Sequence, residues 1–320
     1  MVDSDWRMIK TYLERFSIWM SQPSIRHKVE WPTIALLLIC YFVWGVSTTW
    51  VAEIWLPLGM VLACVSAALH SSLTHEALHG HPTKSAFWNA VLVFPALSVV
   101  VPYLRFKDLH LAHHRESILT DPYDDPESNY LDPIVWADLP NWRKRFYRIN
   151  NTLAGRLIFG PVMGTWAFAA SDWKAIKAGD RRVLLGWVLH VPAMTTVILW
   201  FSLVGNMPVW AWLVSVYGAL SILKIRTFLE HRAHDHASGR TVVVEDKGLL
   251  SLIFLNNNLH VVHHMHSMVP WYRLPNLYWR NKDRYLGRNC GYVYPSYAAI
   301  FRQYMFRSKD PVPHPFWPKP

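Results

Sequence analysis

The sequence predicts an all-α integral membrane protein, a bundle of four spanning helices in two hairpins with interfacial helices and a cytosolic cap. Three observations predict it. Of the 320 residues, 52% are hydrophobic and 17% are charged, and the apolar residues come in long uncharged blocks. The 17 histidines are mostly clustered. This composition excludes a disordered chain and disfavours a soluble enzyme, and three scattered cysteines exclude a disulfide scaffold.

Four blocks have the length of about 20 residues that a helix needs to cross hydrocarbon. They cover residues 33–52, 54–73, 183–204 and 208–229. Only Glu53 separates the first two blocks, and a three-residue link joins the last two. Each pair therefore predicts a tight helical hairpin whose two ends return to the same side of the membrane.

Basic residues set the predicted orientation. The two tight turns carry none, whereas residues 231–320 hold 12 basic and 5 acidic residues, and the segments ahead of both hairpins are also basic. Because short cytoplasmic segments accumulate Lys and Arg, both ends and the central region are predicted to be cytosolic. The formal net charge of +10 then favours anionic membrane lipids as a partner, and no nucleic acid partner is expected.

Two further apolar blocks are expected to stay on the cytosolic side. Residues 86–104 are uncharged but contain Pro95 and Pro102, and residues 157–171 are too short to cross comfortably. A single crossing by either block would place neighbouring histidine clusters on opposite faces. We therefore expect both blocks to lie in the interface, or to dip into the membrane and return.

The chain is predicted to form a single domain, residues 1–320. Residues 1–32 carry an apolar stripe at helical spacing with basic residues outside it, which predicts an amphipathic helix lying in the interface. Residues 33–290 form the predicted core. Residues 291–320 form a cytosolic tail that ends in a proline-rich run.

Three histidine clusters are expected to carry the chemistry. His75 and His79 lie four residues apart, so they share one helix face. The other two clusters share the spacing H-x-x-H-H and comprise His110, His113, His114, His260, His263 and His264. Because a zinc site takes about three or four protein ligands, these eight imidazoles imply two metal ions. Imidazole suits iron, zinc, copper and nickel, so the ligands alone do not choose the metal.

A competing interpretation starts from the same residues. His75-Glu76-Ala77-Leu78-His79 fits H-E-x-x-H, in which two histidines bind zinc and the glutamate is the general base of a metalloprotease. A membrane zinc metalloprotease would leave the other two clusters without a role. On the two-metal interpretation, Glu76 instead orients an imidazole. A carrier is a weaker alternative, because the predicted spans lack interrupted helix pairs.

With the three clusters in this order around two pairs of spanning helices, the sequence resembles the membrane-bound fatty acid desaturase family over roughly residues 33–290. The segment from Pro270 to Pro275 is similar to bacterial acyl desaturases. The resemblance implies a pair of iron ions, O2 as co-substrate, a long-chain acyl lipid as substrate, and a bacterial inner membrane location. It also implies a ninth ligand just after the fourth span, where His231 lies.

The resemblance leaves the reaction open. Membrane diiron hydroxylases and carotenoid ketolases have similar clusters, including a Pro-Trp-aromatic-Arg run after the third. The sequence contains no H-P-G-G motif of a fused cytochrome b5 domain and no cysteine set for an iron–sulfur centre. We therefore expect a separate electron donor of the ferredoxin or cytochrome b5 type.

Overall fold

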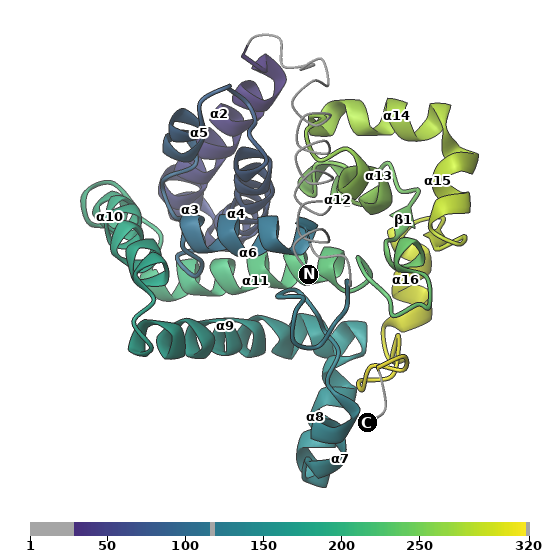
Figure 1. Ribbon diagram of the computed structural model, residues 1–320. Helices are drawn as coiled ribbons and strands as arrows, with labels where there is room; N and C mark the ends of the chain where they lie inside the picture. The colour runs from purple at the N-terminus through teal and green to yellow at the C-terminus, as the bar shows by residue number, and fades with distance from the viewer. Residues whose placement is uncertain (1–28, 116–118, 318–320) are drawn as a thin grey trace, which may run out of the picture.

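The computed structural model describes residues 29–115 and 119–317 (Figure 1). The predicted interfacial segment at the N-terminus lies outside these ranges except for residues 29–32. The described chain is mostly helical, as predicted. Five of its helices are long and apolar enough to cross a membrane: Trp31–Ile54, Leu56–Leu78, Leu153–Lys177, Arg181–Leu203 and Val209–Thr227.

The first hairpin consists of α2 (Trp31–Val46), a π-helical turn η1 (Ser47–Val51), α3 (Ala52–Ile54) and α4 (Leu56–Leu78). Trp55 is extended and separates α3 from α4, and a proline in the first turn of α4 suits a helix start. Gly59 makes the tight return possible, because a Cβ there would lie 2.8 Å from the carbonyl oxygen of Ser47. The outward faces expose large side chains such as Phe42, as expected for helices in lipid.

The second hairpin pairs α10 (Arg181–Leu203) with α11 (Val209–Thr227). Its turn is bound to the turn of the first hairpin. The Asn206 side-chain amide donates to Glu53 Oε2 at 3.1 Å, and the backbone N–H groups of Asn206 and Met207 both donate to the carbonyl of Thr48. The two hairpins therefore turn at the same end of the bundle, and the other ends of their four helices lie at the opposite end.

The block at 157–171 belongs to a longer helix than the sequence predicted. Helix α9 runs over Leu153–Lys177 and is capped by Thr152, whose side chain accepts from the N–H of Gly155. The prediction that this segment is too short to cross a membrane is therefore wrong, because the helix that contains it is long enough. Polar and basic residues extend the helix beyond its apolar middle, because helix ends follow capping and not hydrophobicity.

The contacts of α9 nevertheless keep both of its ends at one end of the second hairpin. Near its start, the Arg156 guanidinium lies 6.0 Å from the ring of Phe228, just after α11. Near its end, Asp172 accepts from Nε1 of Trp187 at 2.9 Å, close to the start of α10. Figure 1 shows α9 running beside α11. That this segment does not cross stays a prediction, because α9 is also one of the five helices that are long and apolar enough to span a membrane.

Residues 86–104 form no spanning helix, as predicted. They give the short helix α5 (Ala86–Leu92), an irregular segment, and the start of α6 (Tyr103–Arg115). The irregular segment is held by α10, because the N–H of Ala96 donates to the carbonyl of Ala193 at 3.2 Å and Nε2 of His190 bonds to the carbonyl of Val99 at 2.9 Å. Backbone groups outside helices are thus satisfied within the protein, as membrane depth requires.

Helix α6 is fixed by a buried ion pair. Arg105 binds Asp172 of α9 through two hydrogen bonds of 2.9 and 2.8 Å, and both side chains are at most 10% exposed. Gly186 of α10 admits the arginine, since a Cβ there would lie 2.9 Å from Arg105 Cγ. The paired guanidinium therefore sets the position of the helix along α9 and α10.

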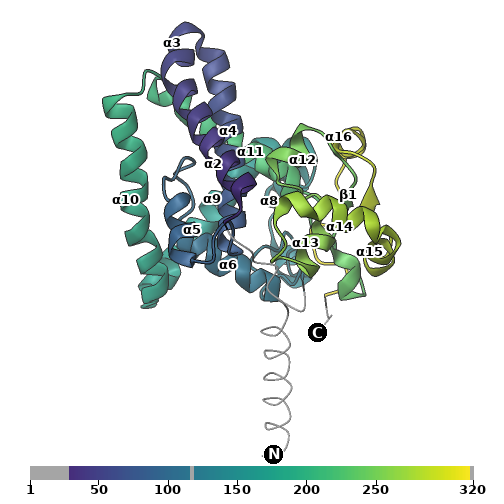
Figure 2. The ribbon, with the colours of Figure 1, turned by 90° about the horizontal axis from the view of Figure 1, so that it is seen from above.

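The remaining elements form a cap beside the hairpins, and Figure 2 shows those from α12 to α16 on the opposite side of the molecule from α10. Its two short strands pair in parallel, with Val243 opposite Val293. The elements are α7 (Pro133–Asp138), α8 (Asn141–Asn150), η2 (Ala237–Arg240), β1 (Val243–Val244), α12 (Leu249–Ile253), α13 (His260–Met265), η3 (Trp271–Arg273), α14 (Leu274–Arg280), α15 (Lys282–Arg288), β2 (Val293–Tyr294) and α16 (Tyr297–Tyr304).

Cysteine labelling tests the shared topology. We expect Glu53→Cys and Asn206→Cys, each in a Cys290→Ser background, to react with a membrane-impermeant maleimide on intact cells, because both positions are exposed at the turns. The exposed native Cys290 should react only after permeabilisation. Labelling of a turn and of Cys290 from the same side would contradict this topology.

The ion pair gives a second prediction. Asp172→Ala should lower the free energy of unfolding by about 3–5 kcal/mol, because it leaves the buried Arg105 charge without a partner. Asp108→Ala is the matched control, since it removes the partly exposed Arg182–Asp108 pair, which also binds α6 to a neighbouring helix, α10, and should cost less than about 1 kcal/mol. Equal effects in urea unfolding of the purified protein would show that α6 is not held by Asp172.

Candidate metal centre

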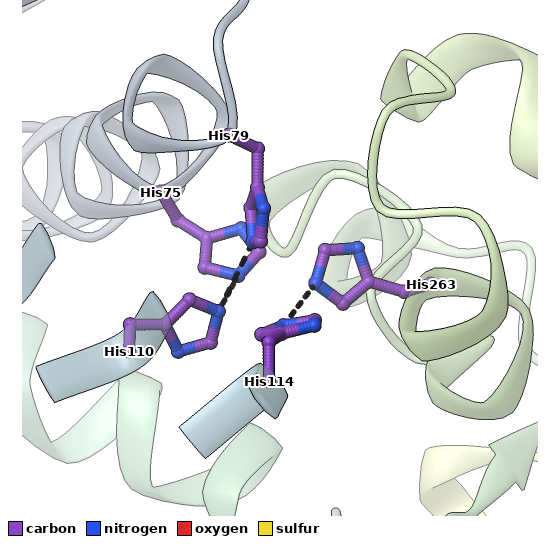
Figure 3. Close-up of side chains that lie close together, drawn as sticks. All are labelled: His75, His79, His110, His114 and His263. Atoms are coloured by element: carbon purple, nitrogen blue, oxygen red, sulfur yellow. Dashed lines mark hydrogen bonds between the residues drawn. The ribbon is translucent and has the colours of Figure 1, made fainter. Parts of the chain in front are cut away.

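The structure brings all nine predicted histidines together in two groups. The first group draws on the end of α4, on α6 and on α13, and its members are His75, His79, His110, His114 and His263 (Figure 3). The second draws on α6, on the segment after α11 and on α13, and its members are His113, His231, His260 and His264. Within each group the candidate ligand atoms lie within 4.8 Å of one another.

Helical spacing explains how each of the two H-x-x-H-H clusters contributes to both groups. In α6 the outer pair, His110 and His114, lies one turn apart and joins the first group, while His113 points to the second. Helix α13 does the reverse: its outer pair joins the second group and His263 joins the first. The two H-x-x-H-H clusters therefore divide their histidines between the two groups in opposite ways. This is the arrangement expected of two helices that lie on either side of a pair of sites.

The spacing of the ring nitrogens resembles that around a metal with ligands at right angles. Six contacts between Nε2 atoms measure 2.8–3.1 Å. With metal–nitrogen bonds of about 2.0–2.1 Å, ligands at 90° have nitrogens about 2.9 Å apart, whereas tetrahedral ligands have them about 3.4 Å apart. The donor set therefore fits ions with five or six ligands better than tetrahedral zinc.

Side chains behind the imidazoles fix which nitrogen faces the centre. Nδ1 of His110 bonds to Glu127 at 2.7 Å, and Nδ1 of His113 bonds to Asp125 at 2.7 Å. A carboxylate only accepts, so each Nδ1 carries the proton and each Nε2 presents a lone pair. Several lone pairs that converge at 3 Å repel one another unless a cation lies among them.

The third cluster has the same kind of support. Nδ1 of His260 lies 3.0 Å from Oδ1 of Asn257, whose amide donates to the carboxylate of Glu230 at 3.2 Å. Glu230 in turn pairs with Arg226 at 2.8 Å. This chain of contacts joins the end of α11 to α13 and holds the ring of His260 in place.

Burial keeps most of these imidazoles neutral, as metal ligands must be. It lowers the pKa of His79 and His263 well below the ordinary value, and the neighbouring imidazoles lower it further. The pKa of His114 falls to about 3 for the same reasons. His113 differs: burial lowers its pKa, but the carboxylates of Glu127 and Asp125 outweigh burial and raise it to about 9. At that ring a metal ion must displace a proton.

The sequence did not predict the residues that support the imidazoles. The bonds from Asp125 and Glu127, in the acidic run at 121–127, to imidazoles were not predicted from the sequence. Nor was the contact by which Asn257 supports His260. Metal-binding imidazoles commonly donate to a carboxylate or carbonyl, so acidic residues near the clusters were the sequence signal for these bonds.

Glu76 is not placed as a protease base. Its Oε2 accepts from the backbone N–H of Trp271 at 3.3 Å, so it ties the end of α4 to the loop before α14. Glu76 was predicted to orient a ligand imidazole, but its carboxylate bonds to the backbone of Trp271 instead. The group that contains His75 and His79 holds five imidazoles, which leaves no room for the open three-ligand site of a zinc metalloprotease.

Two histidines inside the spans have structural roles. His70 lies 3.0 Å from the hydroxyl of Tyr41, and His190 bonds to the irregular segment before α6. Neither belongs to a candidate metal group among the described residues.

Comparison with known proteins agrees with this geometry. Residues 48–296 match the fatty acid desaturase family. A beta-carotene ketolase of Paracoccus sp. (strain PC1) is 25% identical over 261 residues, which cover 75% of this chain and 88% of that protein. A second beta-carotene ketolase, from Paracoccus sp. (strain N81106 / MBIC 01143), is 24% identical over 232 residues, or 69% and 74% of the two chains. The chain belongs to the fatty acid desaturase family of membrane non-haem diiron oxidoreductases.

Proposed function

We propose that this enzyme desaturates a long-chain fatty acyl lipid with O2, using two iron ions held by the nine histidines. One observation carries the proposal: two adjoining groups of imidazoles converge through Nε2 beside an apolar cavity among the spanning helices. The proposal also names the substrate class, a long-chain acyl lipid. Family membership and the apolar surroundings of the centre support this choice of substrate.

The chemistry explains why a metal centre is needed. An unactivated methylene offers no acidic proton to a general base, and a bound iron pair supplies the O2 activation that such a C–H bond requires. Overall, the substrate loses two hydrogens, a donor supplies two electrons, and O2 leaves as two molecules of water with two protons taken up. The chain's own residues orient the imidazoles, exclude water and hold the substrate carbon near the first group.

A second candidate is ketolation of a carotenoid, favoured by the two beta-carotene ketolases among the relatives. Both reactions begin by breaking a C–H bond of a lipid-soluble chain. They differ in whether the substrate then loses a second hydrogen or gains oxygen.

The electron donor is proposed to be a separate acidic protein of the ferredoxin or cytochrome b5 type. The second group has a route to the surface, because a cavity of about 260 Å³ is lined by His264, Ser238 and the exposed Arg288. A basic side chain such as Arg288 at this opening favours encounter with an acidic partner. We place the centre on the cytosolic face of a bacterial inner membrane, where the basic segments lie.

Adjacent histidines give a sharp test of the ligand assignment. His263→Ala removes a ligand of the first group and His264→Ala one of the second, so each variant should retain about one iron per chain and lose a different one of two Mössbauer signals. His266→Ala, just outside the cluster, should keep both ions. Equal iron contents in all three variants would remove these residues from the ligand set.

Lipid mass spectrometry tests the reaction. Cells that express the chain with a reductase and ferredoxin should accumulate acyl lipids lighter by two hydrogens, and His110→Ala should abolish the change. In cells that also make β-carotene, a carotenoid with a ring methylene converted to a ketone would favour the second candidate. Iron-loaded protein that alters neither lipid would refute both.

A further inference from the structure

A cavity of about 410 Å³ lies between the two hairpins, and its walls come from α4, α5, the segment before α6, α6, α10 and α11. Its volume lies within the range of small-molecule sites. Phe87 and Val101 line it and have exposed side chains, so the cavity opens at the surface of the bundle. A hydrocarbon chain could therefore enter it from the bilayer without crossing water.

Three polar groups in the cavity wall are already bonded to the protein. Nε2 of His70 is 3.0 Å from the hydroxyl of Tyr41, the hydroxyl of Thr74 donates to the carbonyl of His70 at 2.8 Å, and His190 bonds to the carbonyl of Val99. The buried hydroxyl of Tyr103 has no partner among the described residues. The rest of the lining is mostly apolar, so the cavity favours a hydrocarbon occupant over a sugar, peptide or nucleotide.

One side chain joins this cavity to the metal centre. Phe106 lines the cavity, and its ring centroid lies 6.3 Å from that of His75 and 5.8 Å from that of His110. Both histidines belong to the first group. Thr74, the neighbour of His75 in sequence, also lines the cavity. The cavity thus reaches the first group at Phe106, whereas the polar opening described above reaches the second group at His264.

We infer that the cavity binds the hydrocarbon chain of the substrate and that Phe106 determines which carbon of the chain is oxidised. The inference rests on the proposed function and adds the binding site and the residue that sets the position of reaction. The phenyl ring stands between the chain and the imidazoles, so its size limits how closely and at which carbon the chain approaches the centre. Phe106 is a positioning residue, since it binds no metal.

Product distribution in variants tests the role of Phe106. Phe106→Ala should retain both iron ions but spread the new double bond over neighbouring carbons, and should consume more O2 per product formed. Phe106→Trp should fill the approach and slow turnover roughly tenfold or more. Phe42→Ala is the matched control, because it makes the same change on an exposed face of α2, outside the cavity lining. It should leave the double-bond position unchanged.

A single product position in Phe106→Ala, with wild-type coupling to O2, would overturn the inference while leaving the proposed function intact. Should Phe106→Ala fail to fold, Phe106→Leu keeps an apolar side chain and should still shift the position. A variant effect on stability alone, with the product position unchanged in both, also counts against the inference.

Photolabelling tests the binding site without turnover. Palmitic acid that carries a diazirine near its methyl end should cross-link wild-type, iron-loaded protein, kept without reductant so that it does not turn over, at residues 86–106 and 186–193, and unlabelled palmitic acid should compete. Labels confined to outward helix faces, such as that of Leu203, would refute the cavity as the chain site. Cavity labelling in a protein that oxidises no lipid would instead refute the proposed function and leave the binding site standing.

Discussion

Convergence of imidazole lone pairs is the constraint on which the rest of the structure depends. Nine histidines point Nε2 atoms into two small, buried spaces, and such an arrangement is stable only around cations. Every element near the centre serves this requirement: α4 ends at it, α6 and α13 flank it, and the loop at Asp125 and Glu127 fixes the ring protons on the outer side. The membrane bundle positions helix ends, and the cap supplies the ligands that the bundle lacks.

The two groups have different surroundings, so the two sides of the metal centre face different environments. The first group meets the apolar cavity at Phe106, and the second meets a polar opening at His264. A lipid chain and a water-soluble electron donor can therefore approach from different sides without competing for the same surface. The ion pair of Arg105 with Asp172 lies on the cavity side and holds α6, which contributes to both groups.

Much of this arrangement could be predicted from the sequence because its signals are local. Uncharged length predicts the hairpins, and the spacing of His75 with His79 and of the two H-x-x-H-H clusters predicts shared helix faces. His231 is different: it stands alone in sequence, and only the family resemblance pointed to it. The structure places it 2.9 Å from His113 through their Nε2 atoms. Whether all nine bind metal remains a prediction.

The features that the sequence did not reveal depend on contacts between distant segments. The full length of α9 follows from its capping residue and polar ends, which hydrophobicity does not report. The bond from Asn257 to His260 and the ion pair of Arg105 with Asp172, 67 residues apart, require the tertiary arrangement. The cavity likewise has no sequence signature, because its walls come from several helices that each look like ordinary apolar segments.

Iron K-edge X-ray absorption of the purified, iron-loaded protein measures the central feature directly. Nine imidazoles shared by two ions should give between four and five histidine nitrogens per iron at about 2.1 Å, with strong imidazole multiple scattering and no sulfur. A spectrum with one or two imidazoles per iron, or a protein that binds a single zinc and no iron under the same loading, would contradict a two-iron histidine centre.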